Sequence, residues 1–170
     1  MSRRLPGTLK VEVEERQPVA WVACRSLGIR ERDRNKGLLL DREGVPFRCE
    51  SQKLWEFSEQ LPVVIVKEAR VDEIREGVAL EHKGLKHALA LILRAQDLLD
   101  LTEQPLWVLV KDEIFLEMKT RGGVVATLSY YDQERQLEQL VKVTTHARRQ
   151  GRELAQVNLI PRRYVPVHYR

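Results

Sequence analysis

The pattern of apolar and polar residues is most regular in the last third of the chain. Three short apolar runs come first, at residues 106–110, 114–118 and 124–130, and in the third run every second residue is apolar. That period of two is typical of a strand with one buried face. From residue 133 to residue 150 the apolar residues recur at steps of three and four, which predicts an amphipathic helix. Alternation returns at 155–159 and again at 165–169, so this segment predicts the order β-β-β-α-β-β.

The ends of this segment carry two further expectations. We expect the Asp132 side chain to cap the helix by accepting a backbone N–H, and Gly151 to end it in a left-handed turn. The last predicted strand would lie at the edge of a sheet. An edge strand has unpaired main-chain groups that can recruit another chain. The strand at 165–169 is therefore where we expect function to reside.

The first hundred residues predict a mixture of strands and helices. Strand-like runs occur at 9–14, 19–23 and 63–66, and the second of these is apolar throughout, as in a strand covered on both faces. Two apolar runs at 38–40 and 45–47, joined by a turn that ends in Gly44, predict a hairpin. A short helix is predicted at 50–60. A longer one is predicted at 82–99, with its apolar face made of Leu85, Ala88, Leu89, Ile92, Ala95 and Leu99.

Composition adds little that is unusual, apart from a basic carboxyl-terminal part. The chain has 170 residues, of which 43% are hydrophobic and 32% charged, with a net charge of +4. Both signs are spread along the chain, which is not typical of a disordered protein. From Lys142 onward seven Lys or Arg residues face one acid, Glu153. Such an excess is compatible with a nucleic-acid or anionic partner, although a solvated basic face is the commoner explanation.

Residues able to carry catalysis are sparse. The two cysteines, Cys24 and Cys49, rule out a zinc site of the paired CxxC type, and either a disulfide or two packed thiols is compatible with the sequence. His82 and His87 lie about 140° apart around a helix, which is poor geometry for a shared metal. No HExxH or GxSxG motif occurs. We therefore expect no catalysis, no cofactor and no metal. No apolar run reaches the roughly 20 residues that a membrane-spanning helix needs.

Several motifs, taken in order, resemble the FtsQ/DivIB family of bacterial cell-division proteins. The string Leu-Pro-Gly-Thr-Leu-Lys-Val-Glu-Val-Glu-Glu-Arg-Gln-Pro-Val-Ala-Trp at 5–21 resembles the strand that leaves the family's POTRA domain and enters its β domain. Residues 39–47, Leu-Leu-Asp-Arg-Glu-Gly-Val-Pro-Phe, resemble the hairpin that follows. The carboxyl half is similar at 107–150 and at 157–161, with Asn158 in place of the family's Asp and Ile160-Pro161 in place of an Arg-aromatic pair.

The resemblance implies an α+β fold, with a mixed, mostly antiparallel sheet packed against two main helices. Residues 1–17 would be the terminal strand of a truncated POTRA domain or a linker, and 18–170 the β domain. The transmembrane helix of the family would be absent from this chain. The implied function is that of a non-catalytic divisome scaffold, on the extracytoplasmic face of the bacterial inner membrane at the septum. It would bind FtsB-like and FtsL-like proteins, have no small-molecule substrate and help regulate septal peptidoglycan synthesis.

The same resemblance places partner binding on the terminal strand, where the partner adds a strand of its own. Tyr169 matches an aromatic position that the family uses against FtsB. An alternative is nucleic-acid binding through residues 148–152 and the terminal arginines, although few aromatic side chains lie among these arginines for base stacking. The partner-binding residues implied by the resemblance are Pro161, Arg162, Arg163, Tyr164, Val165, Val167, His168 and Tyr169.

Overall fold

The computed structural model describes residues 16–170, so the strand predicted at 9–14 lies outside the described residues. Every other predicted strand and helix has a counterpart there, and their ends differ from the predicted ends by a few residues. The elements in chain order are β1 (Pro18–Cys24), β2 (Leu38–Asp41), β3 (Pro46–Phe47), α1 (Gln52–Ser58), β4 (Val63–Val66), the 3-10 helix η1 (Val71–Glu73), α2 (Lys83–Leu98), β5 (Pro105–Val110), β6 (Phe115–Thr120), β7 (Val125–Ser129), α3 (Gln133–Arg149), β8 (Leu154–Asn158) and β9 (Val167–Tyr169).

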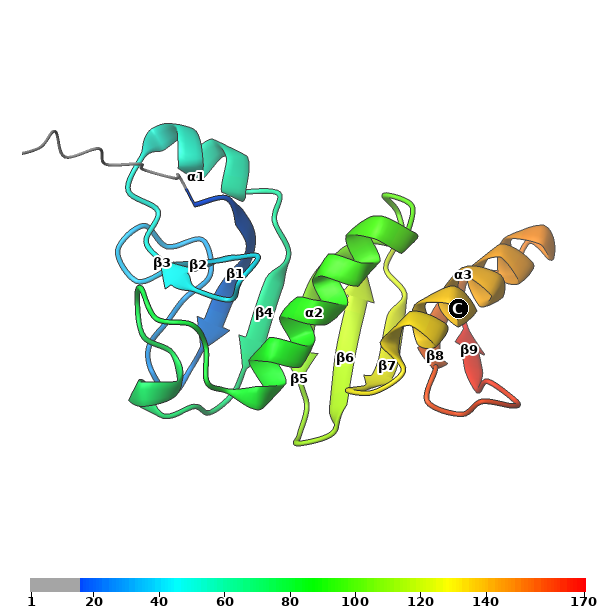
Figure 1. Ribbon diagram of the computed structural model, residues 1–170. Helices are drawn as coiled ribbons and strands as arrows, with labels where there is room; N and C mark the ends of the chain where they lie inside the picture. The colour runs from blue at the N-terminus through cyan, green and yellow to red at the C-terminus, as the bar shows by residue number, and fades with distance from the viewer. Residues whose placement is uncertain (1–15) are drawn as a thin grey trace, which may run out of the picture.

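The strands form one sheet in the order β3-β2-β1-β4-β5-β6-β7-β8-β9 (Figure 1). Neighbouring strands are antiparallel in five pairs and parallel in three, namely β1–β4, β4–β5 and β7–β8. The expected α+β fold with a mixed, mostly antiparallel sheet is confirmed. The sheet is open, with β3 at one edge and β9 at the other.

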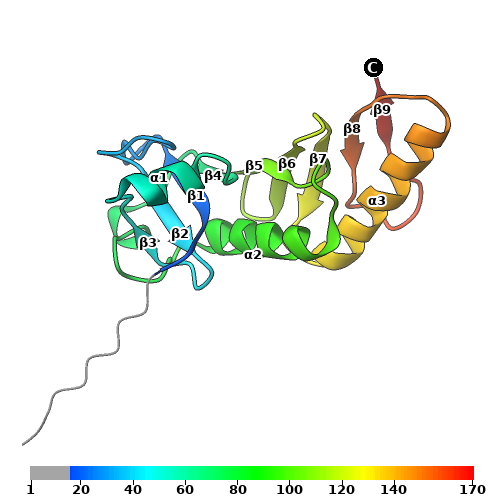
Figure 2. The same ribbon diagram turned by 90° about the horizontal axis from the view of Figure 1, so that it is seen from above.

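The two long helices, α2 and α3, cover the same face of the sheet, as Figure 2 shows from above. The predicted apolar stripe of α2 is buried there, and so is most of the stripe of α3. Every second residue of the strands points to the helices, which is why Val108, Leu116 and Leu128 lie in the same core cluster as the helix residues. The period-two and period-3.6 patterns thus describe the two sides of one interface.

The short helix α1 covers the other face of the sheet, over β1. Trp21 of β1 is fully buried in a second core cluster, which includes Leu39 and Val63 from the neighbouring strands. Its indole packs edge-on against Trp55 of α1, at 5.8 Å between ring centroids, and its Nε1–H donates to the Ser58 carbonyl oxygen at 2.8 Å. Strand β1 is therefore covered on both faces, as its unbroken apolar sequence predicted.

The two cysteines lie in different core clusters, on opposite faces of the sheet. Cys24 belongs to the cluster under α2, and Cys49 to the cluster under α1. Both are free thiols. Burial raises the pKa of the Cys49 thiol, which keeps it in its less reactive protonated form. The structure thus decides between the two possibilities that the sequence left open, in favour of two packed thiols.

The turn between β2 and β3 is built around the buried carboxylate of Asp41. Its Oδ1 accepts the backbone N–H groups of Glu43 at 3.0 Å and Val45 at 2.8 Å. Its other oxygen accepts from the guanidinium of Arg16, at the start of the described chain. Gly44 has a left-handed φ of 77°, a conformation that glycine adopts without strain. Asp41 therefore both shapes the hairpin and holds the entering chain.

Asp41→Ala is expected to destabilise the domain by about 2–3 kcal/mol, because it leaves the buried N–H of Val45 and the partly buried N–H of Glu43 without an acceptor. Chemical denaturation followed by circular dichroism measures this loss. Asp33→Ala is the matched control, since Asp33 accepts two backbone N–H groups in the same way but at the surface. An equal loss in the two variants would contradict the role given to the buried carboxylate.

The ends of α3 bear out one of the two capping predictions. Gly151 has a φ of 63°, and the N–H groups of Gly151 and Arg152 donate to the carbonyls of Arg148 and Ala147, which closes the helix in a Schellman motif. The capping role predicted for the Asp132 side chain is wrong. Asp132 itself has a left-handed φ of 59°, and its carboxylate instead accepts from Arg135 at 2.7 Å. The nearby guanidinium draws the carboxylate away from the helix N–H groups.

Candidate functional site

The edge of the sheet at β9 is the site that the sequence indicated. Strand β9 pairs antiparallel with β8, with Gln156 opposite His168 and Val157 opposite Val167. No other strand of residues 16–170 pairs with its outer side. The expected edge strand is therefore present.

The strand is shorter than predicted. Only Val167–Tyr169 is extended and paired, whereas residues 161–166 form a loop. Val165, which the alternation placed in the strand, lies in this loop, and so does Tyr164, which has a left-handed φ of 54° and is 95% exposed. Pro166 lacks an N–H with which to extend the ladder. Alternation alone could not reveal this limit, because Val165 keeps the period of two across the proline.

The main-chain groups of β9 divide between β8 and the open edge. The Pro166 carbonyl accepts from the Asn158 N–H at 3.0 Å, and the Arg170 N–H donates to the Glu153 carbonyl at 2.9 Å. Because successive residues of an antiparallel strand direct their N–H and C=O to opposite sides, Val167 and Tyr169 direct theirs away from β8. The open edge thus offers two donors and two acceptors to an incoming strand.

The side chains of β9 also divide between the two faces of the sheet. Val165 and Tyr169 are partly buried against the core cluster under α3. Val167 points to the same face, because it lies opposite Val157 of that cluster, but it is more exposed. His168 lies opposite Gln156 on the other face and is exposed. A strand added at this edge would meet Val167 and Tyr169 beside α3.

The basic side chains near this edge are mostly engaged within the chain. The Arg152 guanidinium lies over the Tyr169 ring, 5.3 Å from its centroid. Arg170 donates to the Gly123 carbonyl at 3.3 Å and lies 4.0 Å from the Glu153 carboxylate. Arg162 pairs with Asp132 at 3.5 Å. Of the predicted arginines, Arg163 is exposed and makes no hydrogen bond or ion pair to the described part of the chain.

Beside these arginines lies a buried carboxylate, which no pattern in the sequence indicated. Glu103 is 3% exposed, accepts from the Thr144 hydroxyl at 2.6 Å and pairs with Arg148 at 3.2 Å. It lines a hollow of about 250 Å³, together with Arg152 and Arg170. Thr144 is 41 residues away in sequence. An acid in a loop gives no sequence signal for such a contact, so only the fold could reveal it.

A cavity of about 670 Å³ lies at the carboxyl ends of β4 and β5, and His82, Lys83 and Tyr130 are among its lining residues. His82 caps α2 through its Nδ1, which accepts the Leu85 N–H at 3.2 Å. Within residues 16–170, no group of three or more His, Cys, Asp or Glu side chains is placed to hold a metal ion. None of the helices described there is long and apolar enough to span a membrane.

Comparison with known proteins gives no identification. No protein-family model matches the sequence, and no curated protein is detectably similar to it.

Proposed function

We propose that this domain is a non-catalytic scaffold that binds a partner protein by strand addition at β9. The resemblance of its motifs to the FtsQ/DivIB family extends the proposal to a role in the bacterial divisome, outside the cytoplasmic membrane. FtsB-like and FtsL-like proteins would be its partners, and control of septal peptidoglycan synthesis its biological effect.

The difference between the two edges of the sheet is the observation that carries the proposal. At the β3 edge, the Pro46 carbonyl accepts from the Gly77 N–H at 2.7 Å, and the Gly44 carbonyl from the Leu80 N–H at 2.9 Å. The segment at 77–80 therefore blocks that edge, as is usual where pairing with another chain must be prevented. Among the described residues no such cover lies along β9. An edge left open in a chain that protects its other edge fits recruitment of a strand.

Charge favours an acidic partner over a second copy of this chain. Arg162, Arg163 and Arg170 flank β9. Two copies pairing edge to edge would bring these arginines together, and like charges at an interface are repulsive. An added strand with an acidic flanking residue would pair with Arg163, which makes no hydrogen bond or ion pair to residues 16–170, whereas Arg162 and Arg170 already pair with Asp132 and Glu153. The partner strand we propose is therefore short, with apolar side chains facing Val167 and Tyr169.

Capture of purified partners tests the proposal. The chain, with and without residues 162–170, is immobilised and exposed to the extracytoplasmic segments of the FtsB-like and FtsL-like proteins from the same genome. Capture by the full chain only, with the truncated chain still folded by circular dichroism, is the expected result. Absence of capture by the folded full chain would refute the proposed partners.

The alternative function, nucleic-acid binding through residues 148–152, is tested by measuring the affinity of the same chain for nucleic acid. Arg148 and Arg152, two of its candidate contacts, already pair with Glu103 and Tyr169. Affinity for nucleic acid that falls steeply with salt, together with no protein capture, would favour that function instead.

Tyr169→Ala is expected to weaken partner binding about tenfold while the domain stays folded, because the ring is only partly buried. Titration of the partner measures the binding loss, and thermal unfolding measures the stability. Gln156→Ala is the control, since Gln156 is exposed on β8, away from the open edge, and its affinity is expected to stay near that of the unchanged chain. A large fall in melting temperature for Tyr169→Ala would show that the ring is a core residue.

A further inference from the structure

A second concave site lies at the opposite end of the sheet from β9. It occupies about 490 Å³ between the loop that follows β1 and the segment that follows β4. These two strands are parallel neighbours, so both connections start from the carboxyl ends of the strands, on the same side of the molecule. Crevices outside the carboxyl ends of parallel strands are recurrent ligand sites, and this volume is within the usual range for small ligands.

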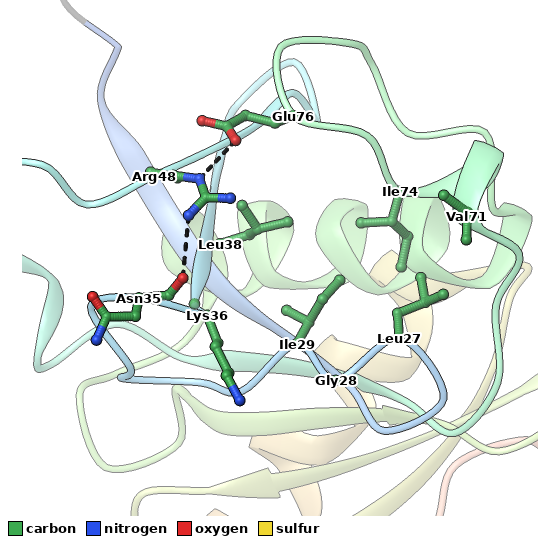
Figure 3. A pocket seen from close by; sticks show the side chains of 11 residues that line it. Leu27, Gly28, Ile29, Asn35, Lys36, Leu38, Arg48, Val71, Ile74 and Glu76 are labelled. Carbon is green, nitrogen blue, oxygen red and sulfur yellow. Dashed lines mark hydrogen bonds and ion pairs between the residues drawn. The ribbon is translucent and has the colours of Figure 1, made fainter.

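The walls of this cavity are aliphatic. Figure 3 shows Leu27 and Ile29 on one side and Val71 and Ile74 on the other, with the side chains of the two pairs pointing toward one another. Leu38 of β2 lies beside them. Val71 is 72% exposed, although it stands next to this apolar surface. The described chain therefore leaves an apolar slot open to solvent.

The polar groups of the cavity gather at one end of the slot. The Arg48 Nε donates to the Glu76 carboxylate at 2.8 Å, and one terminal nitrogen donates to the Asn35 carbonyl at 3.1 Å. Its other terminal nitrogen makes no hydrogen bond to residues 16–170, and in Figure 3 it points toward Leu38. Lys36, also at this end, makes no ion pair with the described residues. Glu50 also lies near Arg48 and Asp33 near Lys36, so the feature able to hold an anion is the free terminal nitrogen of Arg48 and not a net positive charge.

We propose that this cavity binds a small aliphatic carboxylate. The hydrocarbon chain would lie between the Leu27–Ile29 and Val71–Ile74 walls, where it removes apolar surface from water. The carboxylate would accept from the free nitrogen of Arg48, which Glu76 and Asn35 hold in place. The site is separate from β9, and the proposal does not depend on the function proposed for that edge.

Titration with octanoate, below the concentration at which it forms micelles, tests this site in the isolated full chain. Two glycines line the cavity, Gly28 and Gly37, and their amide signals in a two-dimensional ¹H–¹⁵N NMR spectrum are expected to shift and to saturate. The signal of Gly151, at the far end of the sheet, should not move. Octanol, with the same chain and no charge, is expected to bind about tenfold more weakly. Equal affinity for octanol would overturn the carboxylate specificity, and absence of shifts would overturn the site.

Val71→Glu places a negative charge on the apolar wall, where it repels the negative charge of octanoate. The variant is expected to bind octanoate at least about tenfold more weakly. Because Val71 is largely exposed, the variant should fold. Val78→Glu is the matched control, since Val78 is also exposed, at 43%, but does not line the cavity. Equal weakening in both variants would show that the effect is one of net charge and would overturn the assignment to this cavity.

Discussion

Val167→Pro is expected to weaken partner binding by about 30-fold or more without unfolding the domain. The Val167 N–H points away from β8, so a proline there removes no hydrogen bond of the domain. It does remove one of the two donors that the open edge offers to an added strand. A partner carbonyl left without its donor costs about 1–3 kcal/mol, and the proline ring also obstructs the approach of the incoming strand. Together these effects correspond to the expected fold-change.

The measurement is a binding titration of the captured partner, paired with circular dichroism of the free variant. His168→Pro is the matched comparison, because His168 directs its N–H toward β8. There proline is expected to disrupt the β8–β9 pair itself and to lower the melting temperature. Undiminished partner binding by Val167→Pro would contradict strand addition at this edge, whatever the partner. If partner binding is lost only when the domain unfolds, the edge is structural.

Trp21→Ala is expected to cost about 3–5 kcal/mol of folding stability, the largest loss for any single substitution considered. The Trp21 side chain is fully buried, and it fills the space between β1 and α1. Its loss leaves a large cavity and deprives the Ser58 carbonyl of its hydrogen-bond donor. Since domains of this size are stable by only about 5–15 kcal/mol, the variant should approach the limit of folding.

Urea denaturation followed by circular dichroism measures this effect, because fluorescence would change with the loss of the indole itself. Trp107→Ala is the control. Trp107 lies on β5 on the same face of the sheet, but it is only partly buried and is expected to cost about half as much or less. An equal loss of unfolding free energy in the two variants would show that the packing of Trp21 against α1 adds no stability beyond that of a partly buried tryptophan.

Much of the local structure was predictable from the spacing of apolar residues. The helices at Lys83–Leu98 and Gln133–Arg149 follow from stripes at three- and four-residue steps, and β1 from an unbroken apolar run. Glycine and proline marked several ends, such as the Gly151 cap. Predictions were less accurate where a polar side chain had two possible partners. Asp132 is the clear case, because its carboxylate contacts Arg135 and not the helix N–H groups.

The candidate site was only partly predictable. Alternation placed Val167 and Tyr169 on one face, and the structure has them there. It began the strand at Val165, which lies in a loop, because a period of two cannot reveal where pairing with a neighbour stops. Gln136 is fully buried and bonds to Ser129 and Tyr131, yet a glutamine adds nothing to an apolar stripe. Polar residues of this kind are found only once their partners are known.

By itself, the sequence determined which segments are strands or helices and which side of each is buried. Those properties depend on residues a few positions apart, so their spacing along the chain records them. The tertiary structure decided what depends on distant residues. It placed Cys24 and Cys49 on opposite faces, joined Glu103 to Thr144, and used the Gly77 N–H to block the β3 edge while β9 stayed open. These contacts form between segments that meet only when the sheet assembles, and a local pattern carries no record of which segments will meet.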